Sequence, residues 1–436
     1  MSTLMNKAPL ALSSFIVFIY ASYGEFIISL FITTGDKGSF RSPDFLFAVI
    51  VTLLMFFTDF GKQLFNRILA AGEMLPLMLF MFYFFIRLIF EPLDVQQYFV
   101  WIFSTKICPF FIAGFIASSS LSTKISGLRK MIEKANDMSS FKNLAIAGTA
   151  IFVILVIYFF YRISGMSLLE ISDFSYLAND YYQEFGDYAS IAYFSLISLQ
   201  ITYFRLLPYS YRRFTKLVLI VGLQAILAFF TLQAATSNKS VPLIFLVSGS
   251  AIYYCKPKNW LWKRGRPTID ALFVPCLLFL LVVATLHFGS GMDTSKLRIF
   301  DYGQESSLFM NSSITSRLEL IQRVGLDLIW DSPLFGTMIT NDPMHSSVMS
   351  VQVQFGIFGT LLFWPYILIN LRRTYGSEGD ATVKSLAIPI LFVSIISSWF
   401  AWGPLWYLIG RFSGQGKLRA PSREPHYGYP YYRRPQ

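Results

Sequence analysis

The sequence has few charged residues and few cysteines for its length. Charged side chains make up 14% of the 436 residues and hydrophobic ones 54%, whereas soluble domains usually carry about 25% charged residues. Two of the three cysteines, Cys108 and Cys276, fall inside apolar runs, so no disulfide framework is predicted. A Walker loop, a Gly-x-Gly-x-x-Gly turn, a His-Glu-x-x-His motif and paired Cys-x-x-Cys motifs are also missing, so the sequence predicts no ATP-driven transport by this chain alone, no metal site and no cofactor.

The sequence is made up largely of long apolar runs separated by polar segments. Runs of a length suited to the roughly 30 Å hydrocarbon core of a bilayer occur near residues 10–33, 44–58, 73–90, 97–117, 143–161, 188–204, 217–235, 240–254, 269–287 and 348–371. A final run, 385–410, is interrupted by Trp402-Gly403-Pro404 and fits either one kinked span or two short ones. We therefore expect an all-α, polytopic transmembrane helix bundle of about 11–12 spans, with its first run serving as an uncleaved anchor.

Lysine and arginine gather on alternate connecting segments. If Lys7 is cytoplasmic, the segments on its side carry 20 Lys and Arg and the opposite segments carry 8. The positive-inside rule then predicts the orientation of a multi-pass inner-membrane protein, with its N-terminus in the cytoplasm. The net charge of +11 is explained by this topology, and nucleic acid is not predicted as a partner.

The C-terminal residues 411–436 differ from the rest of the chain. They hold six Lys or Arg and are rich in Pro, Gly and Tyr, without apolar periodicity. We expect a disordered cytoplasmic tail after a transmembrane domain at residues 1–410, which favours twelve spans over eleven.

The outward segment 288–347 is far longer than a connection needs. It holds four cations, Lys296, Arg298, Arg317 and Arg323, together with His345. Such a set can hold a pyrophosphate and move a proton. We therefore expect this large periplasmic loop to carry function.

An amphipathic helix is predicted inside this loop. Ser316-Arg317-Leu318-Glu319 fits a capping box, and apolar residues follow at helical spacing up to a stop at Asp331-Ser332-Pro333. Arg317 would lie in the first turn, where a guanidinium beside exposed N–H groups suits phosphate oxygens. An arginine facing lipid headgroups on an interfacial helix is the alternative interpretation.

Other candidate residues also have two interpretations. Arg323 follows Glu319 by four residues, so it fits a surface ion pair as well as a phosphate ligand. His345 fits either a base at the membrane surface or a solvated loop histidine. Lys239, between two apolar runs, fits a functional cation or a simple anchor, and for Arg87 and Lys106 snorkelling or intramolecular pairing is favoured.

Four segments together resemble a known family. Ser316-Arg317-Leu318-Glu319-Leu320, Ser332-Pro333-Leu334-Phe335-Gly336, His345 and Phe355-Gly356-Ile357-Phe358-Gly359-Thr360-Leu361 agree in order and spacing with the signature of O-antigen ligase and polymerase-like (Wzy-type) membrane proteins. Ser237-Asn238-Lys239-Ser240 is similar to a Ser-Arg turn of that family, with lysine in place of arginine. The resemblance covers roughly residues 230–370.

The resemblance implies a metal-independent glycosyltransferase that uses an undecaprenyl-pyrophosphate-linked glycan donor and a glycan acceptor at the periplasmic face. Arg317, with Arg323 and Lys239, would bind the pyrophosphate, and His345 would deprotonate or orient the acceptor hydroxyl. Polymerisation of O-antigen or exopolysaccharide repeat units is the expected activity, with a chain-length regulator and a flippase as partners. Transfer of glycan to lipid A core by a ligase is the nearest alternative.

Two further classes remain open at this point. A non-enzymatic flippase or transporter of lipid-linked oligosaccharide would show polar residues along many spans and inverted repeats, and neither pattern is clear. A membrane scaffold would use its tyrosine-rich tail to recruit a cytoplasmic partner.

Overall fold

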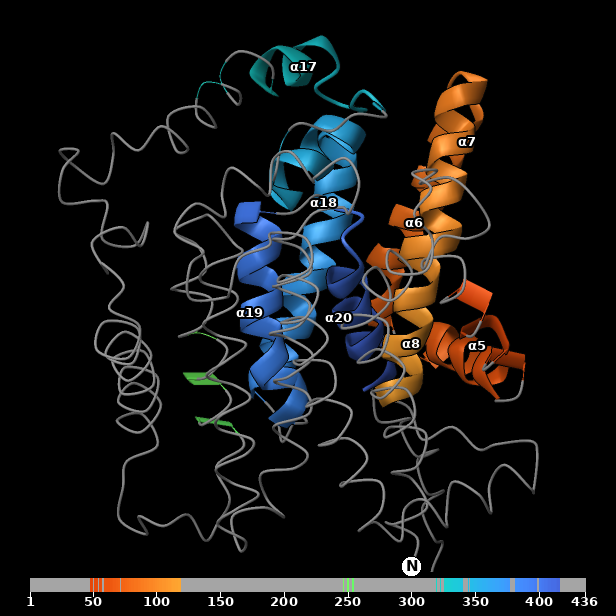
Figure 1. The fold of residues 1–436 in the computed structure, drawn as a ribbon, viewed down its shortest axis with the longest axis vertical. Helices are drawn as coiled ribbons and strands as arrows, with labels where there is room; N and C mark the ends of the chain where they lie inside the picture. Colours follow the sequence, from red (N-terminus) through yellow and green to blue (C-terminus); the bar gives the residue numbers. More distant parts are fainter. Residues whose placement is uncertain are drawn as a thin grey trace, which may run out of the picture.

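The structure, a computed structural model, describes several separate parts of the chain. These parts are residues 59–70, 72–118, 325–339, 346–376, 381–397 and 400–415, with single positions or short runs at 48–56, 246–254, 319, 322 and 344. Within them 88% of the residues are helical and none lies in a strand. Most of these helices stand side by side in a bundle (Figure 1). The prediction of an all-α fold is confirmed for the described residues.

The first long helix matches the apolar run predicted at 73–90. After a 3-10 turn at Gly72–Met74 (η2), α6 runs over Leu75–Ile89 with Pro76 in its first turn. Proline is tolerated there because N–H groups of the first turn have no acceptor within the helix. Its buried residues recur every three or four positions and face the core: Leu77, Phe80, Phe84 and Leu88. The helix ends before Glu91-Pro92 because proline disfavours helical backbone in the residue before it.

The next three elements form one continuous rod. α7, Leu93–Ile102, passes through a π-helical turn at Phe103–Ile107 (η3) into α8, Cys108–Ser118. In the π turn the Cys108 N–H bonds to the Phe103 carbonyl, five residues earlier. Pro109 follows at once, and the wider turn accommodates its ring and missing N–H without ending the helix.

Residues 59–72 differ from expectation. The sequence predicts a connecting segment between two spans there, but residues Phe60–Ala70 form a helix, α5. Leu64 and Ile68, one turn apart, pack against the core cluster. A stripe this short cannot span a bilayer, yet it is enough to dock a helix.

The apolar run 385–410 forms two helices rather than one kinked span. α19, Ala381–Ser397, is followed by a turn at residues 400–402, and α20, Gly403–Gly414, begins there with Pro404 in its first turn. α20 continues past the domain boundary expected at residue 410, because residues 411–414 are helical and buried. The rest of the predicted tail, 416–436, lies outside the described residues.

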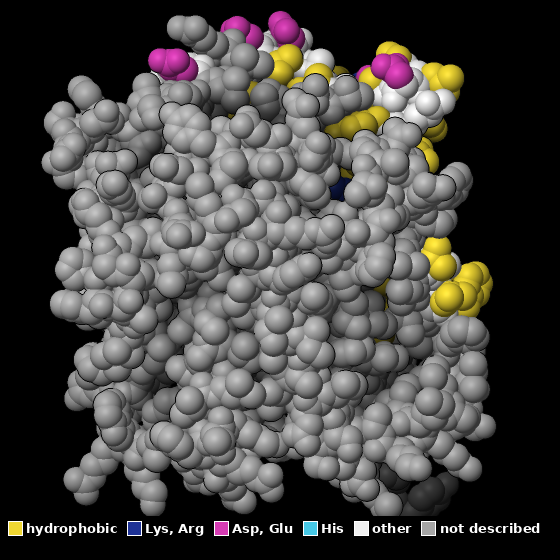
Figure 2. Space-filling view, in the orientation of Figure 1, with side chains coloured by type: hydrophobic (Ala, Val, Ile, Leu, Met, Phe, Trp, Pro, Cys, Tyr) yellow, Lys and Arg dark blue, Asp and Glu magenta, His cyan; other side chains and the backbone are white. Residues whose placement is uncertain are grey.

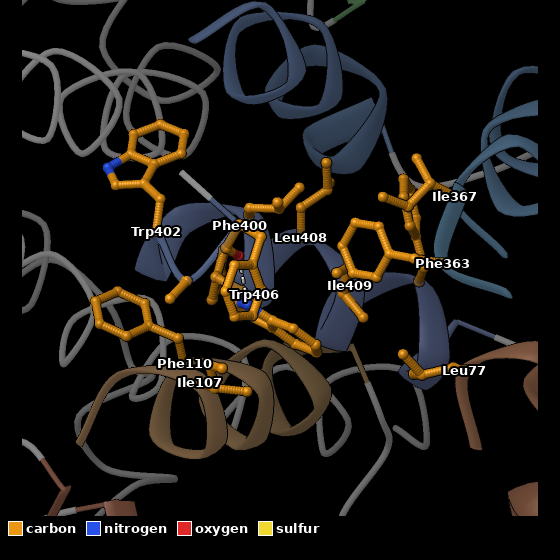
Figure 3. Packing of buried hydrophobic residues seen from close by; sticks show 14 of the residues in the cluster. Leu77, Ile107, Phe110, Phe363, Ile367, Phe400, Trp402, Trp406, Leu408 and Ile409 are labelled. Carbon is orange, nitrogen blue, oxygen red and sulfur yellow. Dashed lines mark hydrogen bonds between the residues drawn. The ribbon is translucent and has the colours of Figure 1, made fainter. Parts of the chain in front are cut away.

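α20 lies in the centre of the described bundle, and every one of its residues is buried. Figure 3 shows Trp406 of α20 among Ile107, Phe110 and Phe363, with its indole N–H donating to the Phe400 carbonyl at 2.8 Å. The hydrogen bond satisfies the one polar atom of a large buried ring. Aromatic packing therefore joins the rod of α7, η3 and α8 to the C-terminal helices.

α8 and α20 approach so closely that their backbones touch, and we call this contact the glycine seam. A Cβ on Gly114 would clash with the Tyr407 carbonyl, and one on Gly410 would clash with the Phe111 carbonyl. Small residues at such crossings are typical of membrane helices. Gly403 lies against Phe110 and Gly410 against Phe115, so the two helices run in the same direction and Ser118 and Gly414 lie at the same end.

Two described helices, Leu93–Ile116 and Ser347–Gly376, are long and apolar enough to cross a membrane, and Leu75–Ile89 and Val383–Ile396 are shorter apolar helices. Large apolar side chains are more than 60% exposed on two of them: Phe82, Ile89, Leu361 and Leu368. Such surfaces suit lipid better than water. These features support the prediction of a membrane protein, while the number of spans and their orientation stay predictions.

Candidate functional site

The four residues predicted to act on a substrate, Arg317, His345, Arg323 and Lys239, all lie outside the residues that the structure describes. Their roles and mutual distances therefore stay predictions. The structure does describe parts of the chain that border Arg323 and His345. These parts include the last turns of the predicted loop helix and the segment that enters α18.

The predicted amphipathic helix is partly described. Positions 319, 322 and 325 are helical, and α17 follows over Leu326–Asp331. Ser332 has φ −145° and ψ 69°, which ends the helix at the predicted stop. A Cβ on Gly325 would lie 2.9 Å from the Met344 sulfur, so the start of α17 packs against the residue before His345.

The helix after His345 is broken at a glycine. α18 runs over Ser347–Gly376, but Gly356 has φ 63° and ψ −162°, which divides it into two half-helices. This backbone conformation is essentially restricted to glycine. A break of this kind deprives backbone groups on both sides of their helical partners, and in an apolar interior each of them needs a replacement.

The segment 332–339 supplies most of those replacements, and we call its contact with α18 the glycine junction. The Ile357 N–H donates to the Pro333 carbonyl at 3.0 Å, and the Phe358 N–H lies 3.3 Å from the Leu334 carbonyl. On the other side of the break, the Val353 carbonyl accepts from the Thr337 N–H at 2.6 Å. The broken helix and the segment therefore complete each other's hydrogen bonds.

Two glycines make this contact possible. Gly336 also has positive φ, at 75°, and a Cβ there would lie 2.5 Å from the Gly356 nitrogen. A Cβ on Gly356 would in turn clash with the Leu334 carbonyl. The two Phe-Gly steps, 335–336 and 355–356, thus cross with no room for a side chain on either glycine. Both steps belong to the segments that resemble the ligase and polymerase signature.

Gln354 holds the far end of the segment. The residue is 1% exposed, and its side-chain amide accepts from the Ile339 N–H at 3.0 Å and donates to the Ile339 carbonyl at 3.1 Å. The Gln354 side chain thus supplies hydrogen-bond partners for both the N–H and the carbonyl of Ile339. Ile339 is fixed against the first half of α18.

Helix α6 holds the near end of the segment. The Tyr83 hydroxyl lies 2.9 Å from the Phe335 carbonyl and 3.1 Å from the Phe355 carbonyl, so its one proton serves both Phe-Gly steps. One turn later, the Arg87 guanidinium donates to the Gly336 carbonyl at 3.0 Å and pairs with Glu91 at 2.8 Å. The intramolecular pairing that the sequence favours for Arg87 is confirmed.

The glycine junction lies toward the end of the bundle where α17 and the start of α7 are found (Figure 1). Figure 2 shows Asp and Glu side chains gathered at that same end. Stacked Phe335 and Phe358 rings, with centroids 5.4 Å apart, are about half exposed beside it. The junction thus combines a polar rim, an apolar face and a set of hydrogen bonds formed within the protein.

The described part of the site is suited to fixing the backbone rather than to binding an ion. The N–H and C=O groups named above already have protein partners. Among the described residues no group of three or more His, Cys, Asp or Glu could hold a metal ion. What this arrangement offers is a fixed position of residues 332–339 against α18 and α6.

Sequence reasoning missed Tyr83 and Gln354 as members of this site. The spacing of Tyr83, Arg87 and Glu91 is a usable signal, because residues four apart share one helix face. Gln354 is one of two glutamines in a mostly apolar run, and a glutamine in a membrane helix suggests a polar partner. Neither signal identifies the partner segment, which lies about 250 residues further along the chain for Tyr83.

Comparisons of the chain with protein-family models, with curated proteins and with solved structures found no match.

Proposed function

We propose that this chain is a polymerase of undecaprenyl-pyrophosphate-linked repeat units for O-antigen or exopolysaccharide, working at the periplasmic face of a bacterial inner membrane. One observation carries the proposal. Segments 332–336 and 355–361, which carry most of the family resemblance, form the glycine junction by direct contact. Met344, beside His345, packs on Gly325, two residues after Arg323. The described parts of the motif segments thus contact one another, which supports a shared site.

The proposed reaction uses positive charge and one base. An acceptor hydroxyl attacks the anomeric carbon of the donor sugar while the bond to the lipid pyrophosphate breaks, and His345 takes the hydroxyl proton. Arg317, with Arg323 and Lys239, holds the departing pyrophosphate. Fixed cations at the point where negative charge develops lower the barrier of such a step. The glycosyl pyrophosphate bond supplies the driving force, so no ATP is consumed.

The arrangement of the helices supports the proposed topology. Positive-inside counting assigns residues 91–96 and 288–347 to the same outer face, and Arg87, one turn before Glu91, bonds to Gly336 of the long outer segment. The counting assigns residues 118–142 and the tail to the inner face. Ser118 and Gly414 lie at the same end because α8 and α20 run in the same direction. This arrangement supports a cytoplasmic tail and twelve spans.

A transporter is the second candidate, because broken helices are typical of secondary transporters. There the break exposes backbone groups that bind the substrate or ion. In this chain the groups freed at Gly356 bond instead to residues 332–339 and to Tyr83. The break, with segment 332–339 held against it, therefore supports an enzyme better than it supports a transport site.

The first test is an analysis of glycans in the source bacterium. A deletion strain is complemented with wild type, with Arg317→Ala or with the matched control Arg298→Ala. The control removes an arginine from the same loop for which the sequence favours a headgroup-facing role over pyrophosphate binding. Lipid-linked and surface glycans are separated on gels, and membrane insertion of each variant is checked by immunoblot. For a polymerase, the deletion and Arg317→Ala strains show single repeat units, whereas wild type and Arg298→Ala restore long chains.

Other outcomes decide between the alternatives. Long polymer that stays on the lipid carrier without reaching lipid A core identifies a ligase. Lipid-linked repeat units that accumulate on the cytoplasmic side identify a transporter. Unchanged glycans in the deletion strain contradict the assignment to this family of reactions, and normal polymer with Arg317→Ala removes Arg317 from pyrophosphate binding.

A further inference from the structure

We infer that Arg87 is a positioning residue of this enzyme: by holding the Gly336 carbonyl it fixes segment 332–339 on α18 and so sets the path of the chain that carries His345. The inference rests on the proposed function for its catalytic consequence. Its structural half, the anchoring of the segment, can be tested without any substrate.

The contacts of Arg87 join two distant parts of the chain. The Arg87 side chain is about three-quarters buried, and its Nη2 atom donates to both the Gly336 carbonyl at 3.0 Å and the Glu91 carboxylate at 2.8 Å. Gly336 is the residue whose positive φ allows segment 332–339 to cross α18. Arg87 therefore holds the segment at Gly336, the residue whose backbone conformation sets the direction in which the segment crosses α18.

The residues that follow Gly336 are also hydrogen-bonded to α18. Thr337 donates to the Val353 carbonyl, and Gln354 holds both backbone groups of Ile339. On the far side of His345, the Ser346 carbonyl accepts from the Ser350 N–H at 2.8 Å. Residues 340–345 thus join two anchored points, and a shift of the first anchor changes where His345 can reach.

The ion pair with Glu91 does not by itself explain Arg87. The pair joins two neighbouring turns of α6, and it leaves the hydrogen bond from Arg87 to the Gly336 carbonyl unexplained. Neutralising Glu91 and holding Gly336 are separate roles, and they make opposite predictions for a double variant. If Arg87 only neutralises Glu91, removing both charges restores function; if Arg87 holds Gly336, it does not.

The test uses the purified full chain in lipid nanodiscs with an undecaprenyl-pyrophosphate-linked repeat unit as substrate. The variants are Arg87→Met, Arg87→Lys, Glu91→Gln, the double variant Arg87→Met/Glu91→Gln and, as a matched control, Arg372→Met at an exposed position of α18. For Arg87→Met we expect kcat to fall by up to about 100-fold, because small misplacements cost that much. KM for the donor should stay within about twofold, since donor binding is not altered.

The other variants separate the two roles. Arg87→Lys, which keeps one charged donor, should recover part of kcat, and Glu91→Gln, which keeps an acceptor for Arg87, should retain most of it. The double variant should stay as slow as Arg87→Met. Wild-type turnover in the double variant would overturn the inference, because Arg87 would then serve only to neutralise Glu91.

Hydrogen exchange supplies a readout that needs no reaction. Backbone amides of residues 337 and 339 should exchange faster in Arg87→Met and at the wild-type rate in Arg372→Met. Unchanged exchange in Arg87→Met would overturn the anchoring role. If purified wild type transfers no glycan, the proposed function and the catalytic half of the inference both fail, while the exchange result still decides whether Arg87 anchors the segment.

Discussion

The glycine seam between α8 and α20 and the glycine junction between segment 332–339 and α18 both bring backbones into contact, but by different physical means. At the seam, Gly114 and Gly410 lie within regular helices, and their missing side chains only create space. At the junction, Gly336 and Gly356 also adopt positive φ, and the touching backbones exchange hydrogen bonds.

The difference lies in what each contact requires. The seam is held by close packing, so its requirement is one of volume. The junction requires volume, a backbone conformation restricted to glycine, and partners for the groups freed by the break. Substitutions at the junction should therefore cost more than equally crowded substitutions at the seam, and changes in both regions can measure the difference.

The largest effect is expected for Gly356→Ala. Positive φ with this ψ costs a non-glycine residue about 1–3 kcal/mol, and the clash with the Leu334 carbonyl adds about 1–3 kcal/mol of overpacking. The free energy of unfolding, measured in detergent by tryptophan fluorescence, should fall by the sum. Gly376→Ala in the same helix is the control, since a Cβ there meets nothing within 4 Å. Equal stability of the two variants would contradict the junction as described.

An intermediate effect is expected for Gly410→Ala at the seam. The new methyl group would clash with the Phe111 carbonyl, but φ is ordinary, so only overpacking of about 1–3 kcal/mol applies. The same unfolding measurement gives the result, with Gly61→Ala in α5 as a control in open space. A loss as large as that of Gly356→Ala would remove the distinction between the two contacts.

The smallest effect is expected for Thr360→Val, which sharpens the account of the break. The Thr360 hydroxyl lies 2.7 Å from Gln352 Oε1 and 2.9 Å from the Gly356 carbonyl, so it bridges the two half-helices. Losing this bond should cost about 1 kcal/mol. Thr52→Val removes an exposed hydroxyl that donates to the Ala48 carbonyl four residues earlier, and it should change stability by less than about 0.5 kcal/mol. Equal losses of stability in the two variants would show that the Thr360 hydrogen bonds contribute no more than an exposed one.

Local patterns in the sequence predicted the described helices well and the contacts between them poorly. The runs at 73–90 and 348–371 contain α6 and most of α18, because about 20 consecutive apolar residues have few alternatives to a helix. The stop at Asp331-Ser332-Pro333 followed from proline chemistry. Helix α5 was missed because its apolar stripe is short and mixed with charge.

The break at Gly356 could not be predicted, since glycine is common in membrane helices and most such glycines keep helical φ. Its replacement partners come from residues 332–339, and Tyr83 and Arg87 come from a helix about 250 residues earlier. Contacts over such separations leave no local pattern. The resemblance nevertheless drew attention to both Phe-Gly steps, although it did not reveal that they touch.

The separation of Arg87 from Gly336 also has a consequence for how the chain is made. The two residues are 249 positions apart, and at about 5–20 residues per second a ribosome needs about 12–50 s to travel that distance. During this interval α6 holds an arginine whose final acceptor has not yet been synthesised. Glu91 follows only four residues later, so a carboxylate is at hand almost from the start. Glu91 can thus neutralise the Arg87 charge until Gly336 has been synthesised and the rest of the bundle has formed.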